Sequence, residues 1–203
     1  MCIRDRHFIR HGQSTWNAEV RIQGSSDPEL SELGISQAKA IADSLPVYDK
    51  VYSSDLIRTR QTTHHLLEGN TDHVDFRPSL REIHLGPWEG LLLADATEQY
   101  PLEVDHFRNT PSKFALDGAE TFTALQARAH QAVNDILAEC EGADIQVLIV
   151  SHGAFLKSLL IDYEGRSIDD IWGLPHMDNC GHSIVHYKDR HPTILKFADL
   201  TEW

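Results

Sequence analysis

Two segments of the sequence place a histidine directly after an apolar run and directly before a glycine. They are FIRHG, from Phe8 to Gly12, and VLIVSHG, from Val147 to Gly153. In open α/β sheets ligands bind at the carboxyl ends of the strands, so His11 and His152 are expected on the same rim. The glycines allow the backbone to approach a ligand closely. The pattern favours a binding site built around two imidazoles.

Two arginines accompany the histidines, and together the four side chains suit a phosphate group. Arg10 precedes His11, and Arg58 falls in the first turn of a helix that follows a third apolar segment. Guanidinium groups bind phosphate oxygens through planar, charge-assisted hydrogen bonds. Backbone N–H groups near Gly12 and Gly153 would add donors, as at helix N-termini.

Histidine at such a site indicates covalent chemistry. A neutral imidazole of His11 is placed to attack phosphorus in line and form a covalent intermediate. His152 would stabilise charge on the equatorial phosphate oxygens. The pattern therefore predicts phosphoryl transfer through His11.

A departing alkoxide also needs a proton, and the segment from Arg81 to Gly90 offers two carboxyl groups. Glu82 is the preferred donor, because burial beside Trp88 and the charge of the phosphate would both favour its neutral form. Glu89 is a rival acid in the same segment.

Each residue alone has a simpler interpretation. An isolated histidine at a strand end is often a satisfied polar residue, and Asn17 is compatible with a turn. Arg58 lies one helical turn from Asp55 and would pair with it on a surface helix. The functional interpretation depends on the residues occurring together.

The order of apolar segments predicts the elements that must position these residues. Strand and helix patterns alternate along the chain, which is typical of a largely parallel sheet with helices on both faces. We find no repeat or linker, so residues 1–203 are expected to form one domain. The expected strands are 7–9, 50–53, 73–76, 145–150, 183–187 and 193–197, and the expected helices are 31–45, 55–67, 95–108 (broken at Pro101), 118–140 and 154–161.

The first six residues fit this scheme poorly. A strand buried on both faces should be almost continuously apolar, but residues 1–6 carry three charges. We therefore expect this segment to be foreign to the fold and the first strand to be shortened.

Composition limits the partners. The formal net charge of −13 would repel nucleic acid and anionic membranes, so an anionic substrate needs a local basic pocket. Three cysteines without metal or redox spacing favour a reducing compartment, and no signal peptide or membrane span is evident. These features predict a cytoplasmic protein. No exposed stripe marks an interface, so the oligomeric state, including a homodimer, stays open.

The chain resembles the histidine phosphatase superfamily, also called phosphoglycerate mutase-like, along nearly its whole length. The matching motifs are RHGQSTWN (10–17), RIQG (21–24), GISQA (34–38), SSDL with RT and QT (53–62), LRE with WEG (80–90) and SHG (151–153). In the place of a Gly-Gly-Glu-Ser run common in the phosphatase branch, this chain has Asp117 to Thr121 (DGAET).

The resemblance implies a three-layer α/β/α sandwich and specific roles. His11 would be phosphorylated, Arg10, Arg58 and His152 would form the phosphate pocket, and Glu82 would donate the proton. Asn17 would contact phosphate, and Gln23 and Gly24 would line the entrance. The resemblance also implies no metal and no other cofactor. The remaining histidines have no zinc spacing and are expected to be solvated; they include His64, His65, His176, His182, His186 and His191.

Hydrolysis is favoured over mutase chemistry, although both use phosphohistidine. The segment between Gly90 and Asp117 is short, with only Arg108 and Lys113 as cations, which does not suit a bisphosphorylated cofactor. The predicted activity is a phosphomonoesterase acting on a small phosphorylated metabolite. A mutase and a non-catalytic phospho-ligand binder are the alternatives.

Overall fold

The computed structural model describes residues 5–140, 145–188 and 190–203. Its described residues form a six-stranded sheet in the order β3-β2-β4-β1-β5-β6. Parallel pairing joins β1 to β4 and β2 to both β3 and β4, whereas β5 is antiparallel to β1 and β6. The strands are β1 Asp5–Arg10, β2 Lys50–Ser54, β3 Val74–Arg77, β4 Val147–Ser151, β5 His182–Lys188 and β6 His191–Lys196.

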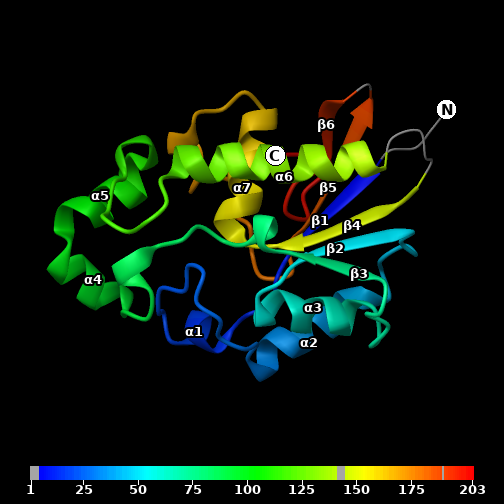
Figure 1. Ribbon diagram of the computed structural model, residues 1–203, viewed down its shortest axis with the longest axis horizontal. Helices are drawn as coiled ribbons and strands as arrows, with labels where there is room; N and C mark the ends of the chain where they lie inside the picture. Colours follow the sequence, from blue (N-terminus) through cyan, green and yellow to red (C-terminus); the bar gives the residue numbers. More distant parts are fainter. Residues whose placement is uncertain (1–4, 141–144, 189) are drawn as a thin grey trace.

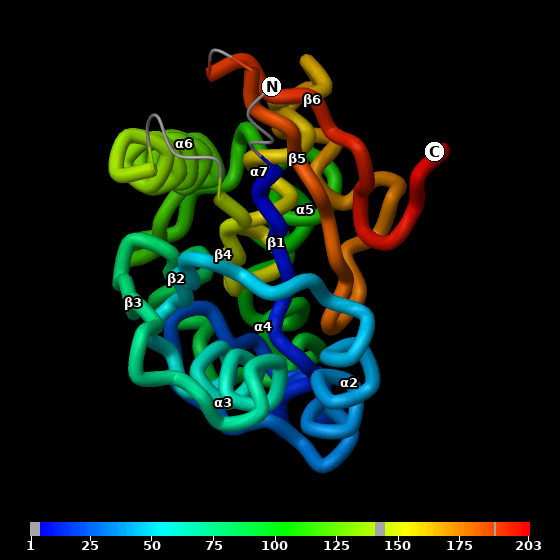
Figure 2. Tube along the Cα trace, turned by 90° about the vertical axis from the view of Figure 1, so that its right-hand side faces the viewer, coloured from blue at the N-terminus to red at the C-terminus, as the bar shows by residue number. Residues whose placement is uncertain are grey.

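Helices cover both faces of the sheet, giving the three layers that were predicted (Figure 1). In the edge-on view, α2 and α3 lie on one side and α6 and α7 on the other (Figure 2). The helices are α1 Thr15–Ala18, α2 Glu32–Ala42, α3 Ile57–Leu66, α4 Leu93–Gln99, α5 Pro101–Asn109, α6 Phe122–Glu139 and α7 Gly153–Tyr163. Short 3₁₀ turns occur at Pro78–Leu80, Gly86–Trp88, Pro111–Lys113 and Ile168–Asp170.

The central strands are apolar on both faces because a helix layer covers each face. Phe8 and Ile149 pack into the core beneath α6 and α7, and their neighbours Ile9 and Val150 pack into the core beside α2 and α3. All four side chains are fully buried. Successive residues of a strand point to opposite faces, so this double burial requires the continuous apolar runs seen in the sequence.

Most expected elements are present, and Pro101 does break the helical segment. Tyr100 is non-helical (φ −132°, ψ 55°), and Pro101 begins α5. Proline fixes its own φ and disfavours helix in the preceding residue, but it suits the first helical position. The short helix α1 was not predicted. It begins at a capping box in which Ser14 and Asn17 exchange hydrogen bonds.

The first strand is longer than predicted, because Asp5 and Arg6 belong to it. Asp5 pairs with His186 on β5, at 2.8 Å between Oδ1 and Nδ1. Arg6 is 1% exposed, and its guanidinium donates to the Ile145 carbonyl at 3.1 Å. Charge at these positions is therefore accommodated by specific partners. Residues 1–4, the rest of the segment expected to be foreign, lie outside the described residues.

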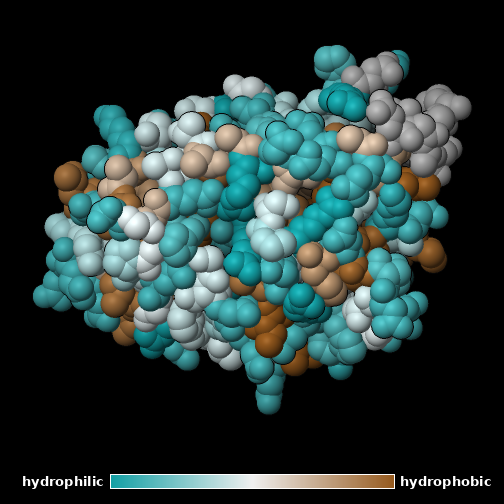
Figure 3. Space-filling model, in the orientation of Figure 1, coloured by the Kyte–Doolittle hydropathy of each residue, from teal (hydrophilic) through white to brown (hydrophobic). Residues whose placement is uncertain are grey.

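No helix within the described residues is both long and apolar enough to cross a membrane. On the face shown in Figure 3, hydrophobic residues occur in small groups on a mainly hydrophilic surface.

One of the histidines expected to be solvated is buried. His182 on β5 is 8% exposed, and its Nε2 lies 2.9 Å from Nδ1 of His7 on β1. Burial lowers the pKa of His182 to about 3, and nearby Lys196 and His7 act in the same direction. The pair is therefore neutral in the folded protein at neutral pH.

We expect this pair to make the fold sensitive to acid. The lowered pKa of His182 means that the unfolded chain takes up a proton near pH 6.5 while the folded chain does not. Stability is therefore complete above about pH 6.5 and falls as the pH drops toward 3, by about 2 kcal/mol at pH 5 from this group. Urea unfolding at pH 7.5 and 5 measures the loss. His182→Gln should reduce it, whereas the exposed-site control His191→Gln should leave it unchanged; an equal loss in both variants would contradict the assignment.

Candidate active site

The predicted site residues meet at the carboxyl edge of the sheet. Arg10 is the last residue of β1 and pairs in register with Ser151, the last residue of β4. Ser54 ends β2, which lies beside β4. His11, His152 and Arg58 follow these three strand ends, so parallel pairing alone brings them to one rim.

His11 is held by its backbone neighbours in a defined orientation. It is 2% exposed, and its Nδ1 lies 2.6 Å from the Gly12 carbonyl. A carbonyl only accepts, so Nδ1 carries the proton and Nε2 keeps its lone pair. A Cβ at Gly12 would lie 2.5 Å from the Gly34 carbonyl oxygen, so only glycine fits there. Burial, then the charges of Arg58 and Arg10, hold the pKa of His11 well below its usual value. His11 is therefore a neutral imidazole whose Nε2 carries a lone pair.

His152 lies beside His11 and is completely buried. The ring centroids are 5.2 Å apart, and Nε2 of His152 lies 2.8 Å from the Ser54 hydroxyl. Its Nδ1 is buried without a hydrogen-bond partner among the described residues. Burial and then Arg58 hold the pKa of His152 well below its usual value. If the Ser54 hydroxyl donates to Nε2, the proton of His152 sits on Nδ1.

Arg10 and Arg58 are oriented by backbone carbonyl groups. Arg58 is fully buried and donates to the carbonyls of Ser26 (2.6 Å) and Gly24 (2.8 Å), and Arg10 donates to that of Met177. The Nε atoms of both arginines are buried without a partner among the described residues. Burial lowers the pKa of Arg58 to about 10, so it remains a cation at neutral pH. Two cations with unused donors form an anion site.

The alternative interpretation of Arg58 as a surface partner of Asp55 is wrong. Asp55 instead receives two hydrogen bonds from Arg81, at 2.7 and 2.6 Å. The hydrogen bonds from Arg81 lower the pKa of Asp55. This pair attaches the segment that contains Glu82 to the segment that contains Arg58.

The Glu82 carboxyl group lies at the N-terminus of α7. Its Oε1 accepts from the N–H groups of Phe155 (3.0 Å) and Ile83 (3.1 Å), and its Oε2 accepts from that of Ala154 (3.1 Å). Trp88, which was expected to shield the carboxyl group, packs in the core with its ring against Phe114. Backbone donors rather than an aromatic ring thus fix where Glu82 points.

Glu89, the rival acid, is committed to structure. Its carboxylate accepts hydrogen bonds from Leu85, from Ser25 through both N–H and hydroxyl, and from the Ser26 hydroxyl. Burial alone would raise the pKa of Glu89, but these hydrogen bonds lower it overall. Glu89, unlike Glu82, does not line the cavity at this edge, so it is not placed to reach a ligand there. A Cβ at Gly24 (φ +51°) would lie 2.3 Å from Glu89 Oε1, so this packing requires glycine.

A cavity of about 480 Å³ opens at this edge. The predicted residues that line it are Arg10, His11, Asn17, Gln23, Gly24, Arg58, Glu82 and Gly153. His152, beside His11, is not among the lining residues. Asn17 Oδ1 accepts from the Ser14 N–H at 3.1 Å, which turns its amide NH₂ the other way. Apolar side chains also line the cavity, among them those of Ile22, Leu85, Phe107, Ile171 and Trp172.

Other residues near the site were not assigned a role from the sequence. Ser54 orients His152, and Asn179 donates to the His11 carbonyl at 3.1 Å. Ser54 lies inside a quoted motif, and its place at a strand end was the signal that could have identified it. Asn179 lies in a C-terminal loop without any motif, and only the fold brings it to His11.

Within the described ranges, no group of three or more His, Cys, Asp or Glu side chains is arranged to hold a metal ion. The Cys140 and Cys180 thiols are free and buried.

The fold and the cluster define an α/β protein with an anion site at its sheet edge and a neutral histidine inside that site. The chain belongs to the histidine phosphatase superfamily (branch 1), which matches residues 7–200. It is 30% identical to phosphoserine phosphatase 1 of Hydrogenobacter thermophilus, over 93% of this chain and 89% of that protein. It is 31% identical to a probable phosphoglycerate mutase of Yersinia pestis, over 90% and 85%. The structure of Bacillus stearothermophilus YhfR matches with a TM-score of 0.91 and 31% identity, over 97% of each chain.

The two site histidines should remain neutral in mildly acidic solution. Burial and then Arg58 lower the pKa of both, so each stays unprotonated as the pH falls through 6.5, where an exposed histidine gains its proton. In NMR spectra of histidine-labelled protein, their ring signals should not shift between about pH 7.5 and 5.5. His11→Ala and His152→Ala assign the signals, and a short histidine-containing peptide in the same buffer is the titrating control. Titration of either site signal in this range would contradict the description.

Proposed function

We propose that the protein is a phosphomonoesterase that hydrolyses a small phosphorylated metabolite through a phosphohistidine on Nε2 of His11. The observation that carries this proposal is the neutral His11 beside two buried guanidinium groups with unused N–H donors. A phosphate bound to those donors would lie next to the nucleophilic nitrogen. Positioning and charge stabilisation are the main requirements of phosphoryl transfer.

In the first step, Nε2 of His11 attacks phosphorus while the ester oxygen departs on the opposite side. The N–P bond forms as the P–O bond breaks, and Arg10, Arg58 and His152 Nδ1 stabilise charge on the three remaining oxygens. Glu82 in its protonated form donates its proton to the departing oxygen. The products of this step are the alcohol and phosphohistidine, with Glu82 left as a carboxylate.

In the second step, water attacks the phosphohistidine. The Glu82 carboxylate accepts a proton from this water as the new P–O bond forms and the N–P bond breaks. Neutral His11, inorganic phosphate and protonated Glu82 are regenerated. One carboxyl group thus serves both steps, and Asn17 would hold a phosphate oxygen through its amide NH₂.

The cationic groups of the cavity favour hydrolysis over mutase chemistry. Apart from Arg10 and Arg58, the lysine or arginine that lines it is Lys157. The Lys157 ammonium already donates to the carbonyls of Gly173 (2.8 Å) and Pro175 (2.6 Å). A second phosphate or a carboxylate would compete with these bonds. A non-catalytic binder is disfavoured because the site contains a nucleophile, phosphate donors and a carboxyl group together.

The surroundings we propose follow from charge and thiol chemistry. A net charge of −13 disfavours nucleic acid and anionic membrane partners, so the partner is a small phosphorylated substrate. Free thiols at Cys140 and Cys180 suit the reducing cytoplasm. The oligomeric state is left to measurement.

The direct test is release of phosphate from p-nitrophenyl phosphate in the presence of EDTA. We expect turnover by the unchanged protein and a loss of at least about a thousandfold in His11→Ala, because the nucleophile is removed. Acid-labile phosphate should appear on the protein during turnover and should be absent from the variant.

Two further results would separate the alternatives. Activity that requires a bisphosphorylated primer, with little release of phosphate, would indicate a mutase. Saturable phosphate binding without any product would indicate a binder. Glu89→Gln is the control for the assignment of Glu82 as the acid. It should lower the stability of the protein but leave protonation of the departing oxygen intact.

A further inference from the structure

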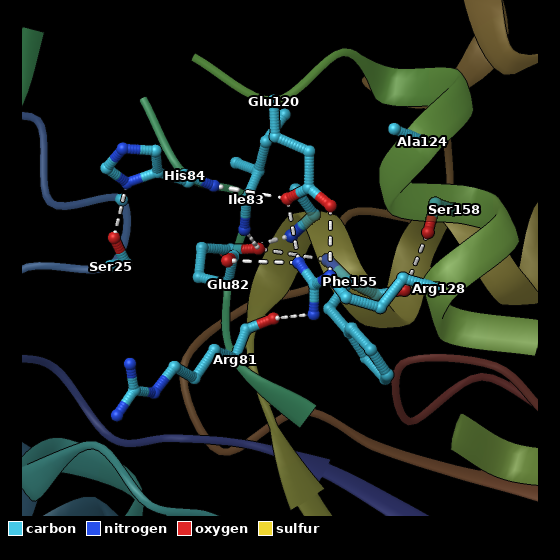
Figure 4. A network of polar contacts seen from close by, with 12 residues as sticks. Ser25, Arg81, Glu82, Ile83, His84, Glu120, Ala124, Arg128, Phe155 and Ser158 are labelled. Carbon is cyan, nitrogen blue, oxygen red and sulfur yellow. Dashed lines mark hydrogen bonds and ion pairs between the residues drawn. The ribbon is translucent and has the colours of Figure 1, made fainter. Parts of the chain in front are cut away.

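Arg128 on α6 and Glu120, just before α6, form an ion pair. This pair holds the backbone of the segment that carries Glu82. Figure 4 shows Arg128 of α6 and Glu120 beside the segment that carries Glu82. Their side chains are joined by two hydrogen bonds, 2.9 Å from Arg128 Nε and 2.8 Å from its Nη2. They are 26% and 17% exposed, so the pair is partly shielded from water.

Arg128 uses every N–H of its guanidinium group. Besides the two bonds to Glu120, it donates to the carbonyls of Ser79 (3.0 Å), Arg81 (2.8 Å) and Glu82 (3.3 Å). An arginine has five N–H donors in a rigid planar fork, and no other side chain reproduces that geometry. Arg128 is therefore matched to the path of the backbone from residue 79 to residue 82.

Glu120 fixes the next part of the same segment. Its Oε2 accepts from the His84 N–H at 3.2 Å, and its own N–H donates to the His84 carbonyl at 2.7 Å. The pair thus holds residues 79–84 along one side. On the opposite side, Arg81 is held by Asp55.

Arg128 also contacts the helix that holds the Glu82 carboxyl group. Its guanidinium lies 5.7 Å from the ring centroid of Phe155, and the Phe155 N–H donates to Glu82 Oε1 at 3.0 Å. One side chain therefore touches both the backbone that carries the carboxyl group and the residue that hydrogen-bonds to it (Figure 4).

We propose that Arg128 and Glu120 are positioning residues for proton donation by Glu82. This inference rests on the proposed function, in which Glu82 protonates the departing oxygen. The pair does not touch substrate, but it sets where the acid lies relative to that oxygen. Displacement of a catalytic group by about 1 Å can reduce a rate by about a hundredfold.

Dependence on the leaving group distinguishes this role from general structural support. p-Nitrophenolate leaves without a proton, whereas the alkoxide of glycerol 2-phosphate needs one. We expect Arg128→Met to lower kcat/KM about a hundredfold for glycerol 2-phosphate and by less than about threefold for p-nitrophenyl phosphate. The ratio kcat/KM is used because it reports the step in which the alcohol leaves.

Three further variants complete the design. Glu120→Gln keeps the shape of the side chain and should produce a smaller loss of kcat/KM, again selective for glycerol 2-phosphate. This variant still tests the proposal if Arg128→Met folds poorly. Arg128→Lys should not restore kcat/KM for glycerol 2-phosphate, since lysine lacks the forked guanidinium group. Arg77→Met is the matched control, because Arg77 on edge strand β3 is likewise a partly buried arginine paired with carboxylates, those of Asp75 and Glu139. It should leave the ratio of the two esters unchanged.

A double substitution tests whether the pair acts through Glu82. Glu82→Gln should show the selective loss by itself, and adding Arg128→Met should cause little further loss. Equal loss for both esters, no loss in either single variant, or additive losses in the double variant would each overturn the inference. If the unchanged protein hydrolyses neither ester, or if Glu82→Gln is not selective, the proposed function itself fails and the inference with it.

Discussion

The central constraint on this structure is the burial of two guanidinium groups beside two imidazoles at one sheet edge. Burial disfavours charge on all four groups, and the mutual repulsion of the cations adds to that cost. Backbone carbonyls from three separate loop positions offset part of it, at Gly24, Ser26 and Met177. A phosphate dianion would offset much of the rest. The carboxylates of Glu82 and Asp178 favour the charge of Arg10 as well, and the proposed phosphate would add to their effect.

This constraint explains why so much of the polar structure consists of loops tied to one another. The loop with Gly24 and Ser26 must stay in place to hold Arg58, and Glu89 fixes that loop through its serine hydroxyls. The segment with Glu82 is held in turn by Asp55 on one side and by Glu120 with Arg128 on the other. Asp55, Glu89 and Glu120 therefore hold loops, whereas Glu82 is the carboxylate that the proposed mechanism uses.

The sequence was most informative where one physical rule decides the outcome. Double burial of the sheet required continuous apolar runs, so the central strands and the rim that carries His11 and His152 were predictable. Asp5 and Arg6 were misjudged because their partners, His186 and the Ile145 carbonyl, lie more than a hundred residues away. The burial of His182 on β5 was missed because its partner His7 lies on the neighbouring strand β1. A contact between two strands leaves no pattern in the local sequence. Arg128 was not assigned any role from the sequence, because the carbonyls that it binds lie more than forty residues away.

The position of β1 has a consequence for how the protein is made. This first strand pairs with β4 and β5, which come from the last third of the chain, and the His11 carbonyl accepts from Cys180 and Asn179. A chain leaving the ribosome therefore carries His11 long before the residues that hold it have been synthesised. His11 cannot be set in its working orientation until β5 has emerged, so catalytic competence is one of the last properties that the nascent chain acquires.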